Sequence, residues 1–235
     1  MPQSLVLAIF VGAALLLILG VVLVLLLVLG SKSHPTRDEL DDQHADVLYR
    51  ALPRGARQFL TAVLQGETVV VLIGPRKAGV GLLLRAFAEV AGDRTRRLRV
   101  QRPVDAVTLV SRNASFLAYA EADGIEEGVA LLHALLAESS PALSGAELWS
   151  AIADRVDLLI LARPQGSGPA TVVEIAEFAE MVTGSKVPPE PSVERIFVWR
   201  DDVEQLAPTG IQPAVLQPMR DAGILLPEHL FVRQP

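Results

Sequence analysis

The sequence predicts a three-layer α/β sandwich that is preceded by one N-terminal transmembrane helix. Three observations carry this prediction. The uncharged stretch Leu5–Leu29 is long enough to cross a bilayer. From Thr68 onward, short apolar runs rich in β-branched residues alternate with helical patterns, as in domains whose helices cover both faces of a sheet. A glycine-containing loop, Gly74–Gly81, joins the first apolar run to the first of these helical patterns.

The stretch Leu5–Leu29 is expected to be an uncleaved membrane anchor within residues 1–30. A helix rises about 1.5 Å per residue, so this stretch covers a hydrocarbon core of about 30 Å, and in lipid only a helix satisfies its backbone. It is too long for a signal peptide and has neither a basic start nor an A-x-A cleavage site. Lys32, Arg37 and Arg50 follow it, which predicts an outside N-terminus and a cytoplasmic C-terminal part.

The rest of the chain divides into a polar linker, residues 31–43, and one domain, residues 44–235. The net charge of −6 disfavours a dedicated nucleic-acid binder. The chain has no cysteine, so no disulfide is expected, and the excess of arginine over lysine indicates a GC-rich, bacterial genome. We expect no metal site, because the histidines lack metal-binding spacing: His34, His44, His133 and His229.

The domain begins with helical spacing from Asp41 to Gln65, which Pro53 and Gly55 should break and Gly66 should end. The expected strands are, in order, Thr68–Ile73, Arg97–Gln101, Asp105–Ser111, Ser115–Glu121, Val156–Leu161 and Arg195–Trp199, with Leu230–Val232 as a candidate edge strand. The expected helices are Gly81–Ala91, Ile125–Glu138 and Thr171–Val182. After the first of these helices, we expect an antiparallel pair of strands.

The loop Gly74–Gly81 has the setting of a phosphate-binding loop, which is a strand, a glycine loop and a helix N-terminus. Gly74 and Gly79 have the spacing of G-x-x-x-x-G-K-[ST]. However, Val80 stands where a lysine should reach the phosphates, and Gly81 stands where a hydroxyl should hold Mg²⁺. The vestigial nucleotide-binding positions here are Gly74, Arg76, Lys77, Gly79 and Gly81.

Three interpretations of this loop stay open. Backbone N–H groups and the helix dipole could hold a phosphate without lysine or metal, with Arg76 or Lys77 adding positive charge. The loop could instead be empty, which we favour because losing both the lysine and Mg²⁺ removes several kcal/mol of phosphate stabilisation. It could also be an ordinary turn between a strand and a helix.

The order of these elements resembles that of the Ras-like small GTPases, across roughly Thr68 to Gln205. In that family an antiparallel strand pair leads to D-x-x-G, and here the segment is Glu121-Ala122-Asp123-Gly124. The resemblance implies that Gly124 faces the γ-phosphate position, that Glu121 replaces the magnesium-linked aspartate, and that Ile125 replaces the glutamine that orients water.

The family's guanine-reading N-K-x-D corresponds to Trp199-Arg200-Asp201-Asp202. Asp202 is therefore a further vestigial nucleotide-binding position, although Trp199 and Arg200 replace the family's asparagine and lysine. The anchor-then-domain layout is similar to that of the membrane-anchored β subunit of the signal recognition particle receptor.

The proline-rich C-terminal tail from Ala207 is one candidate partner-binding surface. Two further surfaces are candidate partner-binding sites. One is a basic cluster: Arg94, Arg96, Arg97, Arg99 and Arg102. It could be a solvated strand edge, or it could contact anionic lipid headgroups or an acidic partner. The other surface comprises Gly124, Glu126 and Glu127, although the helix dipole alone accounts for these two carboxylates.

Together these features predict a membrane-anchored pseudo-GTPase, a docking or scaffold subunit of a membrane-associated protein complex. It is expected not to be an enzyme, and to have no catalytic residue and no cofactor, since GTP or GDP would have little to hold it. One alternative is a divergent GTPase or ATPase whose lysine is Lys77. Another is an unrelated α/β binding domain on a membrane anchor.

Overall fold

The computed structural model describes residues 45–75, 79–111, 114–164, 169–179 and 192–233. The predicted anchor Leu5–Leu29, the linker 31–43, Arg76 and Lys77 lie outside these ranges. Within them, the structure contains no helix with the length and hydropathy needed to cross a membrane. Residues from Asp42 onward form one compact unit.

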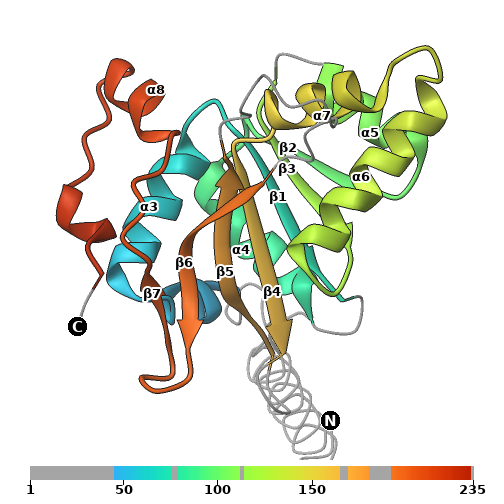
Figure 1. Ribbon diagram of the computed structural model, residues 1–235. Helices are drawn as coiled ribbons and strands as arrows, with labels where there is room; N and C mark the ends of the chain where they lie inside the picture. Colours follow the sequence, from blue (N-terminus) through green and yellow to red (C-terminus); the bar gives the residue numbers. More distant parts are fainter. Residues whose placement is uncertain (1–44, 76–78, 112–113, 165–168, 180–191, 234–235) are drawn as a thin grey trace, which may run out of the picture. The chain divides into compact units, whose positions relative to one another are not determined.

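The sheet of this unit has seven strands in the order β2-β3-β1-β4-β5-β6-β7 (Figure 1). The first four in this order are mutually parallel: β2 (Arg96–Val100), β3 (Phe116–Glu121), β1 (Val69–Gly74) and β4 (Leu158–Pro164). An antiparallel meander completes the sheet: β5 (Ala170–Phe178), β6 (Val193–Arg200) and β7 (Gln205–Pro208). The predicted α/β class is confirmed.

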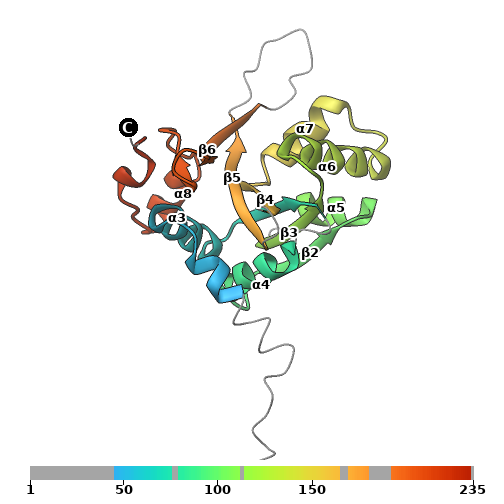
Figure 2. The ribbon, with the colours of Figure 1, turned by 90° about the horizontal axis from the view of Figure 1, so that it is seen from below.

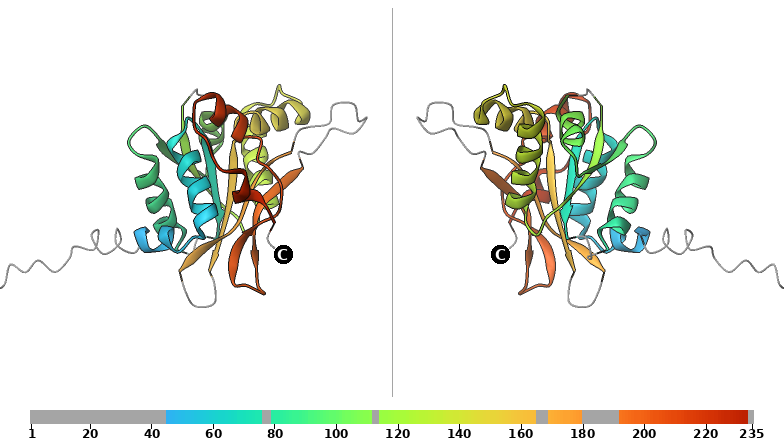
Figure 3. Two further views of the ribbon diagram at one scale, coloured as in Figure 1. Left: turned by 90° about the vertical axis from the view of Figure 1, so that its left-hand side faces the viewer. Right: turned by 90° about the vertical axis from the view of Figure 1, so that its right-hand side faces the viewer.

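Helices cover both faces of the sheet, as Figure 2 and the side views in Figure 3 show. One face carries α3 (Arg54–Gln65), α4 (Val80–Ala91), α8 (Leu216–Asp221) and the 3₁₀ helix η1 (Glu228–Phe231). The other carries α5 (Pro103–Ser111), α6 (Ile125–Ser139) and α7 (Gly145–Ala153). The predicted three layers are therefore present.

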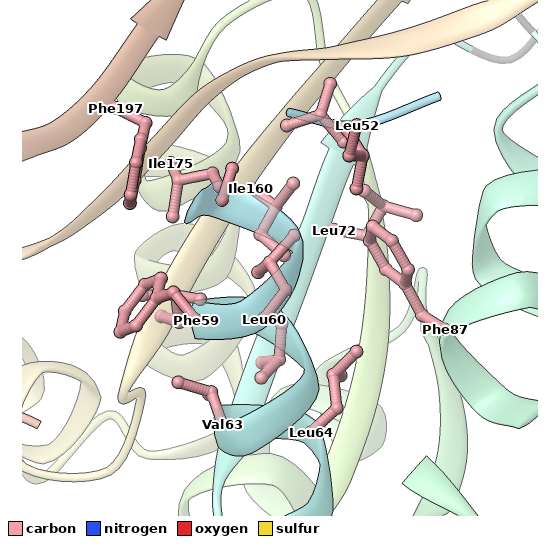
Figure 4. Close-up of a cluster of buried hydrophobic side chains, with 14 of the residues drawn as sticks. Leu52, Phe59, Leu60, Val63, Leu64, Leu72, Phe87, Ile160, Ile175 and Phe197 are labelled. Carbon is pink, nitrogen blue, oxygen red and sulfur yellow. The ribbon is translucent and has the colours of Figure 1, made fainter. Parts of the chain in front are cut away.

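Strand β1 supplies both cores, because its side chains alternate between the two faces and all of its residues are buried. Val70 and Leu72 join the core under α3 and α4, where Phe59 and Phe87 pack (Figure 4). Val69, Val71 and Ile73 join the core under α6. The predicted break before α3 is also confirmed, since a helix at 45–50 ends ahead of Pro53 and α3 ends at the Gly66 C-cap.

The prediction of a strand at Asp105–Ser111 is wrong, because Pro103–Ser111 forms helix α5. The Asp105 carboxylate, in the first turn of the helix, accepts hydrogen bonds from the backbone N–H of Arg102 (2.9 Å) and of Gln101 (3.3 Å), the two residues that precede the helix, and so fixes the helix start. Proline at the first helical position is typical of such a start. These local signals outweigh the β-branched composition of the segment.

Helix α5 also makes the predicted antiparallel pair wrong. It serves as a crossover between β2 and β3, which therefore pair in parallel, with Arg96 opposite Phe116. The structure departs here from the small-GTPase layout that the sequence resembles. The candidate edge strand Leu230–Val232 is wrong as well, since Leu230 and Phe231 end the 3₁₀ helix η1 and are buried against α3.

The prediction of a helix at Thr171–Val182 is wrong over its described part, where β5 runs from Ala170 to Phe178. A bulge lies between Ile175 and Ala176 in the pairing with β6, and a second one breaks the pairing with β4. The shift against β4 leaves one extra residue on β5, so Val172 and Ile175 face the same core. Ala176 is buried in the core of the other face, and the three buried positions have the i, i+3, i+4 spacing of a helix.

Glu177 on β5 fastens the C-terminal segment to the sheet. It is 5% exposed, and both of its carboxylate oxygens accept from the backbone N–H of Ala214, at 2.8 and 2.9 Å. Burial raises the pKa of Glu177 above its ordinary value, although the N–H groups of Ala214 and Val215 favour its ionised form. The segment that leads into α8 is therefore held by a carboxyl group whose pKa is raised by burial.

This raised pKa predicts a pH dependence of stability. The folded state keeps the Glu177 proton at pH values where the unfolded chain has lost it, so the free energy of unfolding should decline as the pH rises from about 4.3, the unfolded value, through the folded pKa. Glu177→Gln should remove this part of the decline in urea unfolding measured over a pH series, and Glu67→Gln, at an exposed position, should not. Equal slopes for wild type and Glu177→Gln would contradict the assignment.

Gly128 lets helix α6 approach strand β1 closely. A Cβ atom there would lie 2.8 Å from Cδ1 and 3.0 Å from Cγ1 and Cγ2 of Ile73. Gly128→Ala should therefore lower the free energy of unfolding by roughly 1–2 kcal/mol, because overpacking displaces the central strand or the helix. Gly145→Ala is the matched control, since a Cβ at Gly145 meets nothing within 4 Å. Chemical denaturation of both variants measures the difference, and an unchanged Gly128→Ala would show that this contact is loose.

Candidate phosphate-loop site at the carboxyl edge of the sheet

The connections of β1 and β3 leave the sheet toward opposite faces. The loop after β1 leads to α4 on one face, and the segment after β3 leads to α6 on the other. Open α/β sheets bind ligands at such a switch point, outside the carboxyl ends of the strands. Gly74 and Glu121 are register partners there, so the structure brings together the two loops that the sequence analysis selected.

Two glycines shape the loop after β1 for steric reasons. A Cβ at Gly74 would lie 2.6 Å from the carbonyl oxygen of Ala162 and 2.8 Å from Cγ2 of Val80, so only glycine fits. Gly79 has φ of 70° at the N-cap of α4, a conformation that favours glycine. Close packing and backbone conformation account for both residues, with no bound ligand needed to explain them.

Val80, at the position where a phosphate-binding loop has its lysine, is a core residue. Val80 is 2% exposed and packs in the cluster under α3 and α4, with Leu83 and Phe87 from its own helix. Gly81, at the position of the missing hydroxyl, is exposed, and a Cβ there would meet nothing within 4 Å. The first turn of α4 thus turns an apolar side chain inward at the point where a phosphate loop presents an ammonium group.

Side chains of β2 and β3 surround the end of β1. The Tyr119 hydroxyl donates to the carbonyl oxygen of Gly74 at 3.1 Å. The Arg99 guanidinium lies 5.7 Å from the centre of the Tyr119 ring and forms an ion pair with Glu121, 3.6 Å between Nη2 and Oε2. Sequence reasoning missed Tyr119, whose signal is a hydroxyl-bearing side chain inside an otherwise apolar strand.

The segment after β3 is also held by its own neighbours. Arg163, near the end of β4, donates from Nε to the carbonyl oxygen of Asp123 at 3.1 Å. The backbone N–H of Asp123 donates to Glu127 Oε2 at 2.8 Å, as in a capped helix start, and Gly124 is the N-cap of α6. Ile125, where the family places its glutamine, is 1% exposed and lies in the core under α6.

An ion-pair network joins α6 to the antiparallel strands. Arg195 on β6 lies 2.5 Å from a Glu126 oxygen and 2.7 Å from a Glu174 oxygen. Burial is the main cause that raises the pKa of Glu174, whereas a backbone N–H and then Arg195 lower the pKa of Glu126. Glu126 is therefore stabilised by an ion pair with Arg195 in addition to the dipole of helix α6.

Asp202 does not join the loop. It lies in the turn between β6 and β7, at the same edge of the sheet as the end of β4 (Figure 3), but β4 and β5 separate β6 from β1. Its carboxylate accepts from Arg200 at 3.0 and 2.5 Å, and this guanidinium lowers the pKa of Asp202. The carboxylate of Asp202 therefore has its hydrogen-bond donor, Arg200, two residues away in the sequence.

The five predicted partner-binding arginines gather along strand β2 and its two ends, and all five are exposed. Arg102 pairs with Asp105, at 3.1 Å. Among the described residues, no group of three or more histidine, cysteine or carboxylate side chains has the arrangement to hold a metal ion.

Comparisons with known proteins leave the family open. Neither a protein-family model nor a curated protein matches the chain. Among solved structures, it is similar to the VirB11 ATPase from the Brucella suis type IV secretion system in complex with sulphate, at 14% identity and a TM-score of 0.47. The likeness covers 62% of this chain and 58% of that one, so this chain matches less than two thirds of that structure. At this score the likeness assigns no activity, and the fold rests on the sheet and loop described above.

A lysine restored at position 80 should destabilise the protein, because its ammonium group would enter the core. Val80→Lys is expected to lower the free energy of unfolding by roughly 2–4 kcal/mol. Gly81→Lys is the matched control, one residue further along the same helical turn but at an exposed position, and should leave stability unchanged or slightly raised. Urea denaturation measures both. A stable Val80→Lys protein that binds Mg²⁺–nucleotide would contradict the placement of position 80 in the core.

Proposed function

We propose that this chain is a membrane-anchored pseudo-GTPase that acts by docking other proteins and does not hydrolyse nucleotide. The observation that carries the proposal is that two positions central to nucleotide chemistry hold core side chains. Val80 and Ile125 are 2% and 1% exposed, in separate cores on the two faces of the sheet. A single lost residue could be replaced from elsewhere, but two positions committed to packing favour a scaffold.

The remaining groups at the carboxyl edge support the same interpretation. Glu121 pairs with Arg99, the carbonyl of Asp123 accepts from Arg163, and Glu126 pairs with Arg195. These are exposed or half-exposed pairs, each worth at most about 1 kcal/mol. Together they hold the segment after β3 with groups of the domain itself, which supports a packed edge at this point.

The strand–loop–helix arrangement favours this proposal over an unrelated α/β domain. Helix α4 begins at Val80, directly after the left-handed Gly79, and its N-terminal end follows the loop as in a phosphate-binding site. The parallel pairing of β2 with β3 places the chain away from the small-GTPase layout, so the resemblance to that family concerns the loops and the order of β1, α4, β3 and α6. Membrane anchorage by Leu5–Leu29 remains part of the proposal.

Nucleotide titration tests the proposal directly. Isothermal titration of the full chain in detergent with GTP, GDP and ATP, each with Mg²⁺, should show no binding in the micromolar range. A phosphate-release assay under the same conditions should show no hydrolysis. Lys77→Ala should behave as wild type. Mg²⁺-dependent binding with turnover, lost in Lys77→Ala, would overturn the proposal in favour of a divergent hydrolase.

A further inference from the structure

Strand β2 forms an outer edge of the sheet, since β3 is its neighbour on one side and no strand is described on the other. The backbone N–H of Arg96 donates to the carbonyl oxygen of Ser115, so residue 96 turns its backbone toward β3. Because the direction alternates along a strand, Arg97 and Arg99 turn their N–H and C=O groups outward. Such an edge attracts foreign strands unless charged residues protect it.

We call this surface the arginine edge and define it by five residues: Arg94, Arg96, Arg97, Arg99 and Arg102. Residues 93–102 carry these five arginines and one aspartate, although the whole chain has a net charge of −6. Within the described part of the chain, no carboxylate forms an ion pair with Arg94, Arg96 or Arg97. Arg99 and Arg102 do have carboxylate partners, yet their side chains remain 48% and 73% exposed. Positive charge is therefore concentrated here.

The start of β2 also borders a hollow of about 450 Å³. Three arginines are among the residues that line it, Arg94, Arg96 and Arg155, together with Thr95 and Ser115. Arg155 is half-buried and donates to the carbonyl of Ala114, which fixes its position. The lining described includes one carboxylate, Glu67, against these three cations. Guanidinium groups and hydroxyls are the donors that recognise phosphate oxygens.

We propose that the arginine edge binds the anionic headgroups of the membrane, with the hollow beside Arg155 receiving one headgroup phosphate. The inference deepens the proposed function and rests on it, because an anchor in the same chain would keep the edge at high local concentration beside the bilayer. Each basic residue near an anionic leaflet contributes to attraction, and arginine pairs with phosphate through two parallel hydrogen bonds. Single-stranded nucleic acid fits less well, since no aromatic side chain interleaves with these arginines.

Because the sequence has no cysteine, one introduced cysteine provides a single site for attaching a fluorophore. In the full chain, Ser111→Cys places one fluorophore at the exposed end of α5 beside the edge, and Gln217→Cys places one on α8 as the reference. Energy transfer to labelled lipid is measured in nanodiscs of phosphatidylcholine, with and without phosphatidylglycerol. We expect phosphatidylglycerol to raise transfer from position 111 more than from position 217, and added salt to reverse the rise.

Charge reversal of the edge tests the residues. Arg96→Glu with Arg97→Glu should lower the equilibrium constant for the lipid-docked state by at least about 30-fold, since each basic residue at an anionic surface contributes a factor of about five. Arg54→Glu with Arg233→Glu, which makes the same charge change at exposed positions outside the edge, should keep the phosphatidylglycerol effect. Arg96→Gln with Arg97→Gln should give a smaller loss, and thermal melts verify that each variant folds.

Two outcomes would overturn the inference: transfer that does not depend on phosphatidylglycerol, or a phosphatidylglycerol effect that survives the reversal at positions 96 and 97. If those variants instead lose an acidic protein that copurifies with the chain, while transfer stays unchanged, the edge binds protein rather than lipid. Retention in membranes after a carbonate wash reports the anchor separately, because it depends on Leu5–Leu29 and should be equal in all these variants. Loss of retention would count against the proposed function and not against the arginine edge.

Discussion

The rest of the domain depends on strand β1, because it is the element shared by both cores. Its neighbours β3 and β4 run parallel to it, and its side chains alternate between the layer of α3 and α4 and the layer of α6. Burial of its five apolar side chains contributes roughly 1.5–3 kcal/mol each relative to exposure. Every other feature of the candidate site is positioned from its end at Gly74.

The close approach at that end explains why the site looks like a phosphate loop and lacks its chemistry. Gly74 lies against Ala162 and Val80, so the chain must leave the sheet without a side chain and must enter α4 with an apolar one. At positions 74 and 80, packing alone accounts for the residues present. On the other face of the sheet, Ile125 at the start of α6 likewise places an apolar core side chain where the small-GTPase family has a polar one.

The sequence predicted best those elements whose pattern is fixed by burial on both faces. Within the predicted strands Thr68–Ile73 and Val156–Leu161, the segments Val69–Ile73 and Leu158–Leu161 are apolar throughout, and the structure contains β1 and β4 there. Sequence-based prediction failed where a helix cap or an irregular strand pairing determined the secondary structure. Asp105 caps a helix in a segment with strand-like composition, and the extra residue Val173 in the pairing of β5 with β4 gives a strand the burial spacing of a helix.

The candidate site could be predicted in part for the same reason. The loop motif located Gly74 and Gly79, and strand pairing then placed Glu121 opposite Gly74. Three contacts could not be predicted, because each joins residues that are 40 or more positions apart in the sequence: Tyr119 with Gly74, Arg163 with Asp123, and Arg195 with Glu126. The parallel pairing of β2 and β3 could not be predicted either, since it follows from helix α5.

We propose that the carboxyl edge is a packed scaffold that binds no nucleotide. A ligand that binds the folded state raises its stability in proportion to the logarithm of its concentration over its dissociation constant. Thermal unfolding of the full chain in detergent, with Mg²⁺ and increasing GTP or ATP, is therefore the most direct measurement. We expect a melting temperature that does not change with either nucleotide. A rise that requires both Mg²⁺ and a triphosphate, and that is absent with Mg²⁺ alone, would contradict it.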